Sequence, residues 1–457
     1  MESQNRHIRR RFKIWHGIVA LLLLVFMLYR VSGILKLKKQ IDSLRNEGYP
    51  VTLEELDRWY HIPEGARNGA DVYMAAFSNY VEWDKDTLKT LPIVGKAPLP
   101  ERTQPLDDPN QQLVEKFLSD NEETLTLLHE AASIEHCRYP IDLTKGSVDL
   151  MERPGLVASW YEDLRDSTQL LHLETLSLCE NQNPDKALES VRANFALARF
   201  IGAPLIVHRF VHNLVQSRTY KSIERILNRI QLTDEQLLSL SAWIKESRSD
   251  EGYKKALVGE QCLGLHAFRG HIRQVSDQIG SKGRLSLLFL AFLRMTGLND
   301  RDAIEYIALM QEHIDAMELP SDERLLVCDS IQEDVNSGKR GGILTRLIWP
   351  VRVYMLQIDT GCTAKALAAQ TALAVERYRL AKGHLPESLE NLVPAYMEVV
   401  PTDPFDGQTL KYRTLETGFV VYSVGEDLTD EGGAELGRGR DKRGKPLPWD
   451  ITFIVER

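Results

Sequence analysis

An apolar run near the N-terminus constrains this chain more than any other feature of its sequence. Residues 14–35 read IWHGIVALLLLVFMLYRVSGIL, with Arg30 as the only charged residue. A helix rises 1.5 Å per residue, so the run is roughly 33 Å long, enough to cross a hydrocarbon core of about 30 Å. Trp15 and Tyr29 lie near its two ends, where aromatic rings favour the headgroup layer. The run predicts a transmembrane helix over residues 14–35.

The charges that flank this run predict its orientation. Residues 1–13 carry five Lys/Arg, a denser basic flank than the one beyond the run. The positive-inside rule therefore makes residues 1–13 a short cytoplasmic tail and exports the body of the chain. A cleaved signal peptide is the alternative, with a tolerable cleavage site at Val31-Ser32-Gly33. The run is longer than the apolar core of about 7–15 residues in such peptides, so we expect a retained signal anchor.

The distribution of charge excludes one class of partner. The chain has 56 Lys/Arg and 65 Asp/Glu, and residues 1–39 hold nine of the basic residues and one of the acidic ones. The remaining 418 residues therefore carry 47 basic and 64 acidic side chains, a net charge of −17. A body this acidic cannot neutralise a phosphate backbone, so we expect no nucleic-acid binding.

The cysteine pattern favours single thiols. The five cysteines are scattered and form no Cys-x-x-Cys pair: Cys137, Cys179, Cys262, Cys328 and Cys362. An exported protein could join some of them in one or two disulfides. Free Cys behaves as a small apolar residue, so we predict buried single thiols.

Residues 36–109 are expected to form a linker with short helices and a Pro-rich loop. Residues 36–46 can continue the transmembrane helix as a polar helix. Thr52-Leu53-Glu54-Glu55 has the pattern of a capping box and opens a short helix, and a second helix is predicted over 68–80. Five prolines between residues 91 and 109 predict a loop.

Residues 110–340 are predicted to form a helical domain without strands. Ser119-x-x-Glu122 and Thr233-x-x-Gln236 have the spacing of capping boxes before apolar runs. Apolar residues follow helical spacing over 164–178 and 187–200, and this pair resembles a tetratricopeptide-type hairpin. No 34-residue period accompanies it, so we expect a bundle or irregular stack and no repeat array.

Residues 341–457 are predicted to form a small α+β domain after a Gly-rich boundary at 336–342. Helices are expected over 343–358, interrupted by Pro350, and over 363–382, followed by a stop at Gly383. A short helix over 387–396 is expected to bury Leu389, Leu392 and Val393. β-prone runs at 410–414 and 419–424 predict a hairpin, and 450–455 a last strand. The predicted fold class is therefore mainly α, with antiparallel strands near the C-terminus.

The C-terminal segment holds an ordered set of motifs that resembles a known family. A helix ending in Tyr-Arg is followed by Gly-x-x-Pro, Asp-Pro-x-x-Gly, Tyr-Ser-x-Gly, an acidic glycine loop and Asp-Ile. The positions are Tyr378, Arg379, Gly383, Pro386, Asp403, Pro404, Gly407, Tyr422, Ser423, Gly425, Asp427, Gly432, Gly433, Asp450 and Ile451. This order is similar to the globular head of the major pseudopilins of type II secretion systems. The resemblance covers residues 363–457 and implies a bacterial inner-membrane protein with a periplasmic body.

The N-terminal part departs from that family. A pilin-like subunit has Glu at the fifth position after its glycine cleavage point, whereas Leu22 stands there after Gly17. About 300 residues also separate the apolar run from the pseudopilin-like segment. We therefore expect a pseudopilin-like head that does not polymerise, with a true minor pseudopilin as an alternative.

An acidic loop at residues 425–435 (GEDLTDEGGAE) is the candidate metal site. Calcium takes six to eight hard oxygen ligands, which an acidic loop bent by glycine can supply. The resemblance implies calcium, because the corresponding pseudopilin loop binds it. Asp427 matches a family ligand directly, while Asp430 and Glu431 match in character. EF-hand spacing is absent, and a solvated acidic loop is the alternative.

Other candidate motifs are incomplete. His208 and His212 stand four residues apart, a spacing that suits a metal, but lack the Glu of His-Glu-x-x-His. We interpret them as ordinary surface or boundary histidines. Gly-x-Ser-x-Gly and a Walker A loop are absent from the sequence. The basic segment 437–445 is interpreted as a solvated hairpin, with contact to lipid headgroups or a partner as the alternative.

The sequence therefore predicts a single-pass membrane-anchored, exported protein that acts as a binding or scaffold module with protein partners. The resemblance adds an association with a secretion system. No convergent catalytic set supports an enzyme, and no cofactor is predicted besides the calcium. An envelope hydrolase is the alternative, with acids and histidines of residues 110–340 meeting in space.

Overall fold

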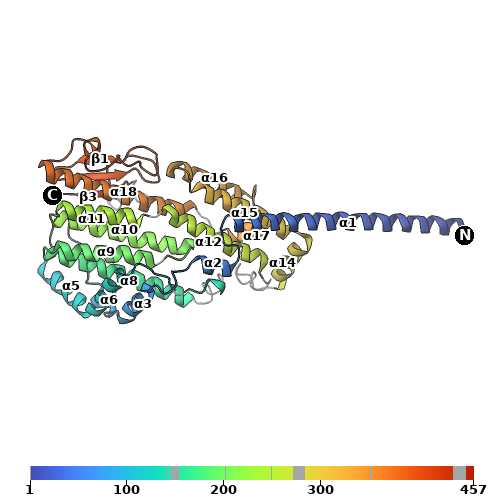
Figure 1. Cartoon of the computed structure of the whole chain (residues 1–457), viewed down its shortest axis with the longest axis horizontal. Coiled ribbons are helices and arrows are strands. Elements are labelled where there is room, and N and C mark those ends of the chain that lie inside the picture. The colour runs from blue at the N-terminus through green and yellow to red at the C-terminus, as the bar shows by residue number, and fades with distance from the viewer. Residues whose placement is uncertain are drawn as a thin grey trace.

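The molecule consists of a long projecting helix and a mostly helical body with one small sheet. The computed structural model describes residues 2–139, 141–145, 154–200, 202–248, 250–270, 284–349, 353–435 and 449–457. Helix α1 (Glu2–Asn46) extends from one end of the body, and the sheet lies near the other end (Figure 1). The predicted fold class, mainly α with antiparallel strands near the C-terminus, is confirmed.

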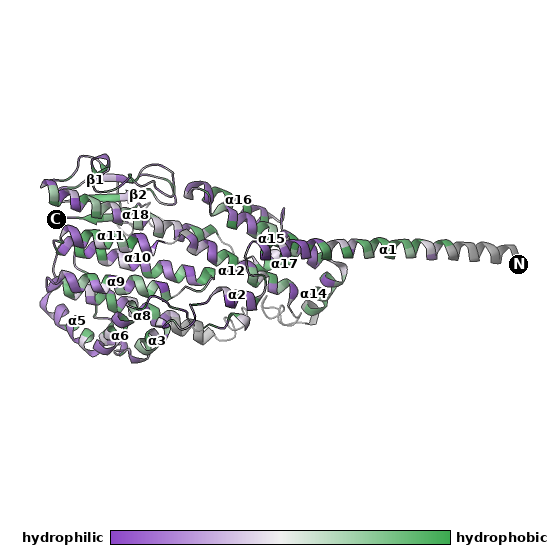
Figure 2. Cartoon of the chain, viewed as in Figure 1, coloured by the Kyte–Doolittle hydropathy of each residue, from purple (hydrophilic) through white to green (hydrophobic). Residues whose placement is uncertain are grey.

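Helix α1 contains the predicted apolar run and continues into the body. Among the described residues it is the one helix that is long and apolar enough to cross a membrane. Its apolar section stands clear of the body (Figure 2). The polar continuation over 36–46 is confirmed, and Ile41 and Leu44 within it are buried against Val51, Leu265 and Ile307.

Short helices follow α1 and lead into the body. Their bounds are α2 (Leu53–Trp59), α3 (Gly69–Asn79), α4 (Lys85–Leu88), α5 (Asp108–Asp120) and α6 (Glu122–Ala132). Thr52 caps α2 as predicted, because its hydroxyl accepts a hydrogen bond from Glu55 N at 3.2 Å. The cap predicted at Ser119 is displaced by two residues, because α5 continues through Asp120 and α6 begins at Glu122 after Asn121. Asp107 caps α5, and buried Phe117 keeps its last turns in the core.

The middle of the chain is helical, as predicted. Its elements are η1 (Leu143–Lys145), α8 (Pro154–Glu180), α9 (Pro184–Phe200), α10 (Ile206–Arg229), α11 (Asp234–Ser247), α12 (Asp250–Arg269), α14 (Arg284–Thr296), α15 (Leu298–Ala316) and α16 (Ser321–Ser337). The hairpin predicted from 164–178 and 187–200 is the packed pair α8 and α9. The capping box at Thr233 is confirmed, with both of its hydrogen bonds present.

The C-terminal part combines helices with the sheet. Its elements are α17 (Ile343–Ile348), α18 (Val353–Lys382), η2 (Leu389–Leu392), β1 (Lys411–Thr414), β2 (Phe419–Ser423) and β3 (Ile451–Val455). The strands are antiparallel in the order β1-β2-β3, so the predicted hairpin and last strand are confirmed. Gly383 ends α18 as predicted, with a φ of 78° that suits glycine.

Two predictions for this part are wrong. The break expected between residues 358 and 363 does not occur, because Gly361 continues α18 and the Ile451 side chain packs close beside it. The helix expected over 387–396 is reduced to the single 3₁₀ turn η2, and Val393 is exposed. Pro394 accounts for the difference, because a proline disfavours helical backbone at the preceding residue.

The core is built around α10 and α18. One cluster joins α9, α10, α11 and α18 to the sheet, so that Ile223 and Leu240 share a core with Phe419 and Val421. A second cluster packs α3, α5, α6 and α8 against α9, and a third joins α12, α15 and α16. Apolar contacts therefore continue across the predicted boundary at residue 340, which falls in a turn where Gly338 and Gly341 both have positive φ.

The cysteines take no part in disulfides. All five are free thiols, and Cys179, Cys262 and Cys328 are fully buried. Burial raises the pKa of each thiol to about 12. The prediction of single thiols is therefore confirmed.

Candidate ligand-binding site

A cleft of about 630 Å³ opens between α8, α10, α18 and the residues around β3. This volume is within the range of about 300–1,000 Å³ that is usual for small-molecule sites. Helical spacing explains two of its walls: Asn213, Ser217 and Lys221 repeat every four residues on α10. Gln357, Gly361 and Lys365 do the same on α18. The lining also includes Leu99, Pro100, Arg102, His172, Leu176, Leu214, Glu224, Arg225, Tyr354, Ile358, Cys362, Glu426, Glu435, Trp449, Asp450, Ile451 and Thr452.

Ion pairs fix one wall of the cleft. Arg102 Nε donates to Glu224 Oε1 at 3.1 Å, and the same guanidinium pairs with Glu435 and with Glu456. Arg225 donates to the carbonyls of Glu101, Arg102 and Gln104 at 2.7–3.0 Å. The predicted Pro-rich loop is therefore held against α10.

Two lysines in the cleft have no carboxylate partner of their own. Within the ranges that the structure describes, neither Lys221 on α10 nor Lys365 on α18 forms an ion pair or a side-chain hydrogen bond. Burial lowers the pKa of Lys365 despite the neighbouring Glu224, and the positive charge of Lys221 lowers it further. Two ammonium groups that repel each other across a cleft would be stabilised by an anion between them.

His172 lies among the positive charges of this part of the cleft. Burial is the main cause that lowers its pKa to about 3, and the charges of Lys221, Arg218 and Arg225 contribute. The imidazole is therefore neutral near pH 7 and a weak base. The Glu224 carboxylate is already engaged, by Arg102 and by the backbone N–H of Ile454 at 3.1 Å. A carboxylate and an imidazole thus share the cleft, but this arrangement favours binding over acid–base catalysis.

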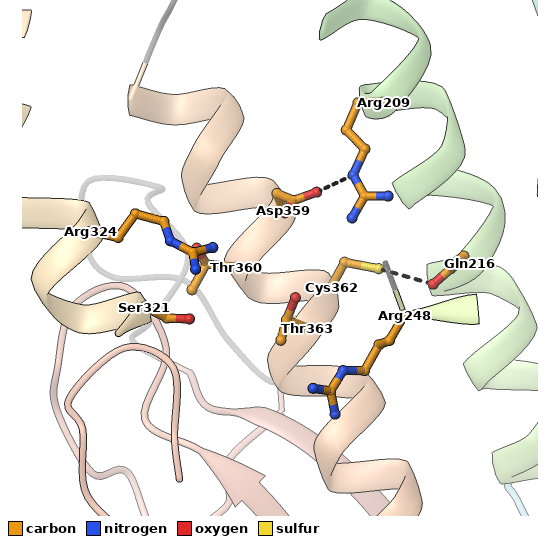
Figure 3. Close-up of a pocket in the computed structure, with 9 residues that line it drawn as sticks. All are labelled: Arg209, Gln216, Arg248, Ser321, Arg324, Asp359, Thr360, Cys362 and Thr363. Atoms are coloured by element: carbon orange, nitrogen blue, oxygen red, sulfur yellow. Dashed lines mark hydrogen bonds and ion pairs between the residues drawn. The ribbon is translucent and has the colours of Figure 1, made fainter. Parts of the chain in front are cut away.

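A smaller polar pocket shares Cys362 with the cleft (Figure 3). Its lining includes Arg209, Arg248 and Arg324 together with Asp359. Arg209 Nε donates to Asp359 Oδ1 at 2.6 Å, and Asn213 donates to the same oxygen at 2.8 Å. The volume of about 20 Å³ accommodates little more than one water molecule. We therefore interpret this pocket as a structural junction and the cleft as the ligand site.

The three predicted calcium ligands lie on the loop after β2. Asp430 Oδ1 accepts hydrogen bonds from Tyr422 Oη at 3.0 Å and Gly432 N at 2.9 Å, and its Oδ2 lies 3.7 Å from Lys411 Nζ. Asp427 Oδ1 accepts from Thr429 N at 3.1 Å. Burial raises the pKa of Glu431, and so do the nearby charges of Asp427 and Asp450.

No group of three or more His, Cys, Asp or Glu side chains is arranged to hold a metal in the part of the chain that the structure describes. The calcium site therefore stays a prediction. His208 is buried and does not lie at a surface or boundary as predicted, because α8, α9, α12 and α18 all pack against α10. Burial lowers the pKa of His208 and of His212 to about 4. The basic segment 437–445 lies outside the described residues.

Asp403 and Asp450, two acids of the C-terminal sequence motifs described above, form hydrogen bonds with other motifs of that set. Asp403 accepts hydrogen bonds from Ser423 Oγ at 2.8 Å and from Val424 N at 2.9 Å. Asp450 accepts from Gly433 N at 2.7 Å and from Ala434 N at 3.2 Å. The Asp-Pro turn is therefore bonded to the end of β2, and the start of β3 to the acidic glycine loop.

Comparisons of this chain with protein-family models, with curated proteins and with solved structures found no significant match.

Proposed function

We propose that this chain is a single-pass membrane-anchored protein whose exported body binds a ligand in the cleft. The length and composition of α1 support the anchor, since no other described part of the chain covers its apolar window. The denser basic flank at residues 1–13 supports a cytoplasmic N-terminus. Trypsin added to intact spheroplasts should then digest the body, and complete protection would contradict the orientation.

The proposal that the body binds a ligand rests on the side chains that line the cleft. Lys221 and Lys365 present unpaired positive charge, while Leu214, Ile358 and Trp449 offer apolar surface beside it. A ligand that satisfies both has an anionic group joined to an apolar moiety. Carboxylates and phosphates are the anionic groups that ammonium groups bind with charge-assisted hydrogen bonds.

Octanoate is a suitable probe because its uncharged counterpart, octanamide, has nearly the same shape. We propose calorimetric titration of the full chain in lipid nanodiscs with each compound, and with octyl phosphate as a second anion. Octanoate should bind more tightly than octanamide. The double variant K221M/K365M should bind octanoate about tenfold more weakly, the loss expected when a charged hydrogen-bond donor is removed.

The variant K382M is the matched control, since Lys382 lies on the same helix but at its exposed end. It should bind octanoate as the wild type does. If K221M/K365M also bound octanoate with unchanged affinity, the cleft would not be the anion site. Because octanoate partitions into the nanodisc equally for all variants, differences between them report on the protein.

We also propose that residues 363–457 form a pseudopilin-like head that places the protein beside a secretion apparatus and its protein partners. The order of the motifs supports this, together with the packing of α18 against β2 and β3. Pull-down from detergent-solubilised membranes should recover proteins of that apparatus, and their consistent absence would contradict the association. Mass spectrometry of the mature N-terminus tests the minor-pseudopilin alternative, which requires cleavage after Gly17 and a methylated Ile18.

A further inference from the structure

Helix α14 exposes a continuous apolar face. Leu288, Phe289, Phe292 and Met295 form this outer face of α14, and Leu288 and Met295 are 68% and 74% exposed. The opposite side of the helix is already packed, since Leu290 and Leu293 are buried in the body. A patch of large apolar side chains on one helix needs a covering surface that the rest of the described chain does not supply.

The position of α14 beside α1 indicates what covers this face. One residue, Gly297, separates α14 from α15, with a φ of 82° that allows the sharp turn. At the start of α15, Asp300 Oδ2 pairs with Arg30 Nη1 at 2.6 Å. The Arg301 guanidinium lies 4.4 Å from the centre of the Tyr29 ring. The C-terminal end of α14 is therefore held at the level of residues 29–30 of α1.

That level lies near the C-terminal end of the predicted membrane-spanning segment, residues 14–35. Arg30 is the first charged residue after the apolar run begins at residue 14, and Tyr29 is of the type that favours the headgroup layer. Residues 14–29 rise roughly 24 Å as a helix, so this level lies within about 6 Å of the far side of a hydrocarbon core of about 30 Å, near the headgroup–acyl boundary. Exposed Lys36 and Lys39 follow on the side of the body. Figure 1 shows α14 at the end of the body from which α1 extends.

We propose that the outer face of α14 inserts into the interface of the same bilayer that α1 crosses. This inference rests on the membrane anchoring proposed above. Leu and Phe side chains on one face are typical of helices that lie in the headgroup–acyl boundary. We infer that the bilayer is what covers this face, because the Arg30–Asp300 pair holds α14 beside the point where α1 would leave the lipid.

Nitroxide labels on the full chain test the insertion directly. Cysteines introduced as M295C and L326C compare two equally exposed apolar positions, since Leu326 on α16 is 73% exposed. The variant L22C reports whether α1 itself is in lipid. The burial that raises the pKa of the native thiols to about 12 slows their labelling. Labelled wild type serves as the blank.

The labelled proteins are reconstituted in phosphatidylethanolamine–phosphatidylglycerol vesicles, and the accessibility of each label to oxygen and to a water-soluble nickel chelate is measured. Labels at 22 and 295 should be relaxed mainly by oxygen, and the label at 326 mainly by the chelate. Oxygen-type relaxation at 22 with chelate-type relaxation at 295 would overturn the inference and leave the anchor intact. A label at 295 shielded from both agents would also overturn it, because a protein surface would then cover α14. Chelate-type relaxation at 22 would overturn the anchor as well.

Discussion

Replacing Asp359 with Ala should destabilise the body strongly, because it leaves a buried guanidinium without its carboxylate. The side chains of Asp359 on α18 and Arg209 on α10 are only 9% and 13% exposed. Burial by itself would lower the pKa of Arg209, but the attraction of Asp359 outweighs burial and raises it. Asn213 also loses an acceptor in this variant.

The magnitude follows from the geometry of the pair. At 2.6 Å and an effective dielectric constant of about 20, the Coulomb attraction is about 6 kcal/mol. Desolvation of both groups offsets much of this attraction in the intact pair. Removing Asp359 takes away this attraction while the Arg209 guanidinium stays largely desolvated, so D359A should lower the free energy of unfolding by about 3–5 kcal/mol. The double variant R209M/D359L removes both charges and should lose only about 1–3 kcal/mol, the cost of leaving the buried Asn213 amide without its acceptor.

Urea unfolding of the full chain in detergent micelles, followed by tryptophan fluorescence, measures these differences. A lower midpoint with an unchanged slope indicates a loss of stability without a change in the surface exposed. The control is D86A, which breaks the surface pair of Asp86 with Lys89 and should have no measurable effect. The reasoning is refuted if D359A behaves like D86A, or if R209M/D359L is as unstable as D359A.

Three further predictions concern the helix caps, pH and calcium. T233A should lower the free energy of unfolding by about 1 kcal/mol in the same urea assay, because Gln236 N loses its acceptor; T233S, which keeps the hydroxyl, should not. Burial holds the pKa of His208 and of His313 near 4, against 6.5 when exposed, so the unfolded chain binds more protons between these values. Stability should therefore fall as pH drops from 6.5 to 4, by up to about 1.4 kcal/mol per pH unit for each histidine, and H313Q should flatten this slope in urea titrations. Millimolar calcium should raise the melting temperature of the wild type but not of D430N, and an equal shift in both would contradict the predicted site.

Local signals predicted the elements that depend on neighbouring residues. The N-cap at Thr52, the capping box at Thr233, the stop at Gly383 and the β hairpin each need only a few adjacent positions, and all were confirmed. At Thr52 the second half of the box is missing, because Glu55 accepts from Val51 N and not from Thr52 N. The cap predicted at Ser119 was two residues early, because α5 continues through Asp120 and α6 begins only at Glu122, after Asn121. Local patterns do not show which of two possible caps the packed core selects.

Gly361 and His208 illustrate predictions that depended on distant residues. Separate helices were predicted on either side of residues 359–362, but Gly361 lies within the continuous helix α18, and Ile451, ninety residues later, packs beside it. His208 was taken for a surface or boundary residue, whereas four helices around α10 bury it. Tertiary packing overrides local preference in both cases.

The candidate cleft was not predicted for the same reason. Lys221 and Lys365 belong to helices separated by more than a hundred residues, and neither stands in a recognisable motif. The periodicity of each helix shows which residues share a face, but not which other helix that face meets. The only available signal was a lysine at an inward position of an Ala-rich helix, and Lys365 occupies such a position between buried Ala364 and Ala366.

The unbroken course of α1 determines how the body stands on a membrane. The same helix holds the apolar run, the contacts of Tyr29 and Arg30 with α15, and the buried Ile41 and Leu44. In the anchored protein that we propose, it would act as a stiff stalk, because α1 is one continuous helix from the apolar run to the segment inside the body. We therefore expect the cleft to keep a fixed height along α1 and to face a fixed direction around the axis of that helix. A ligand or a neighbouring protein that diffuses in the plane of the membrane would always meet the cleft mouth at the same height.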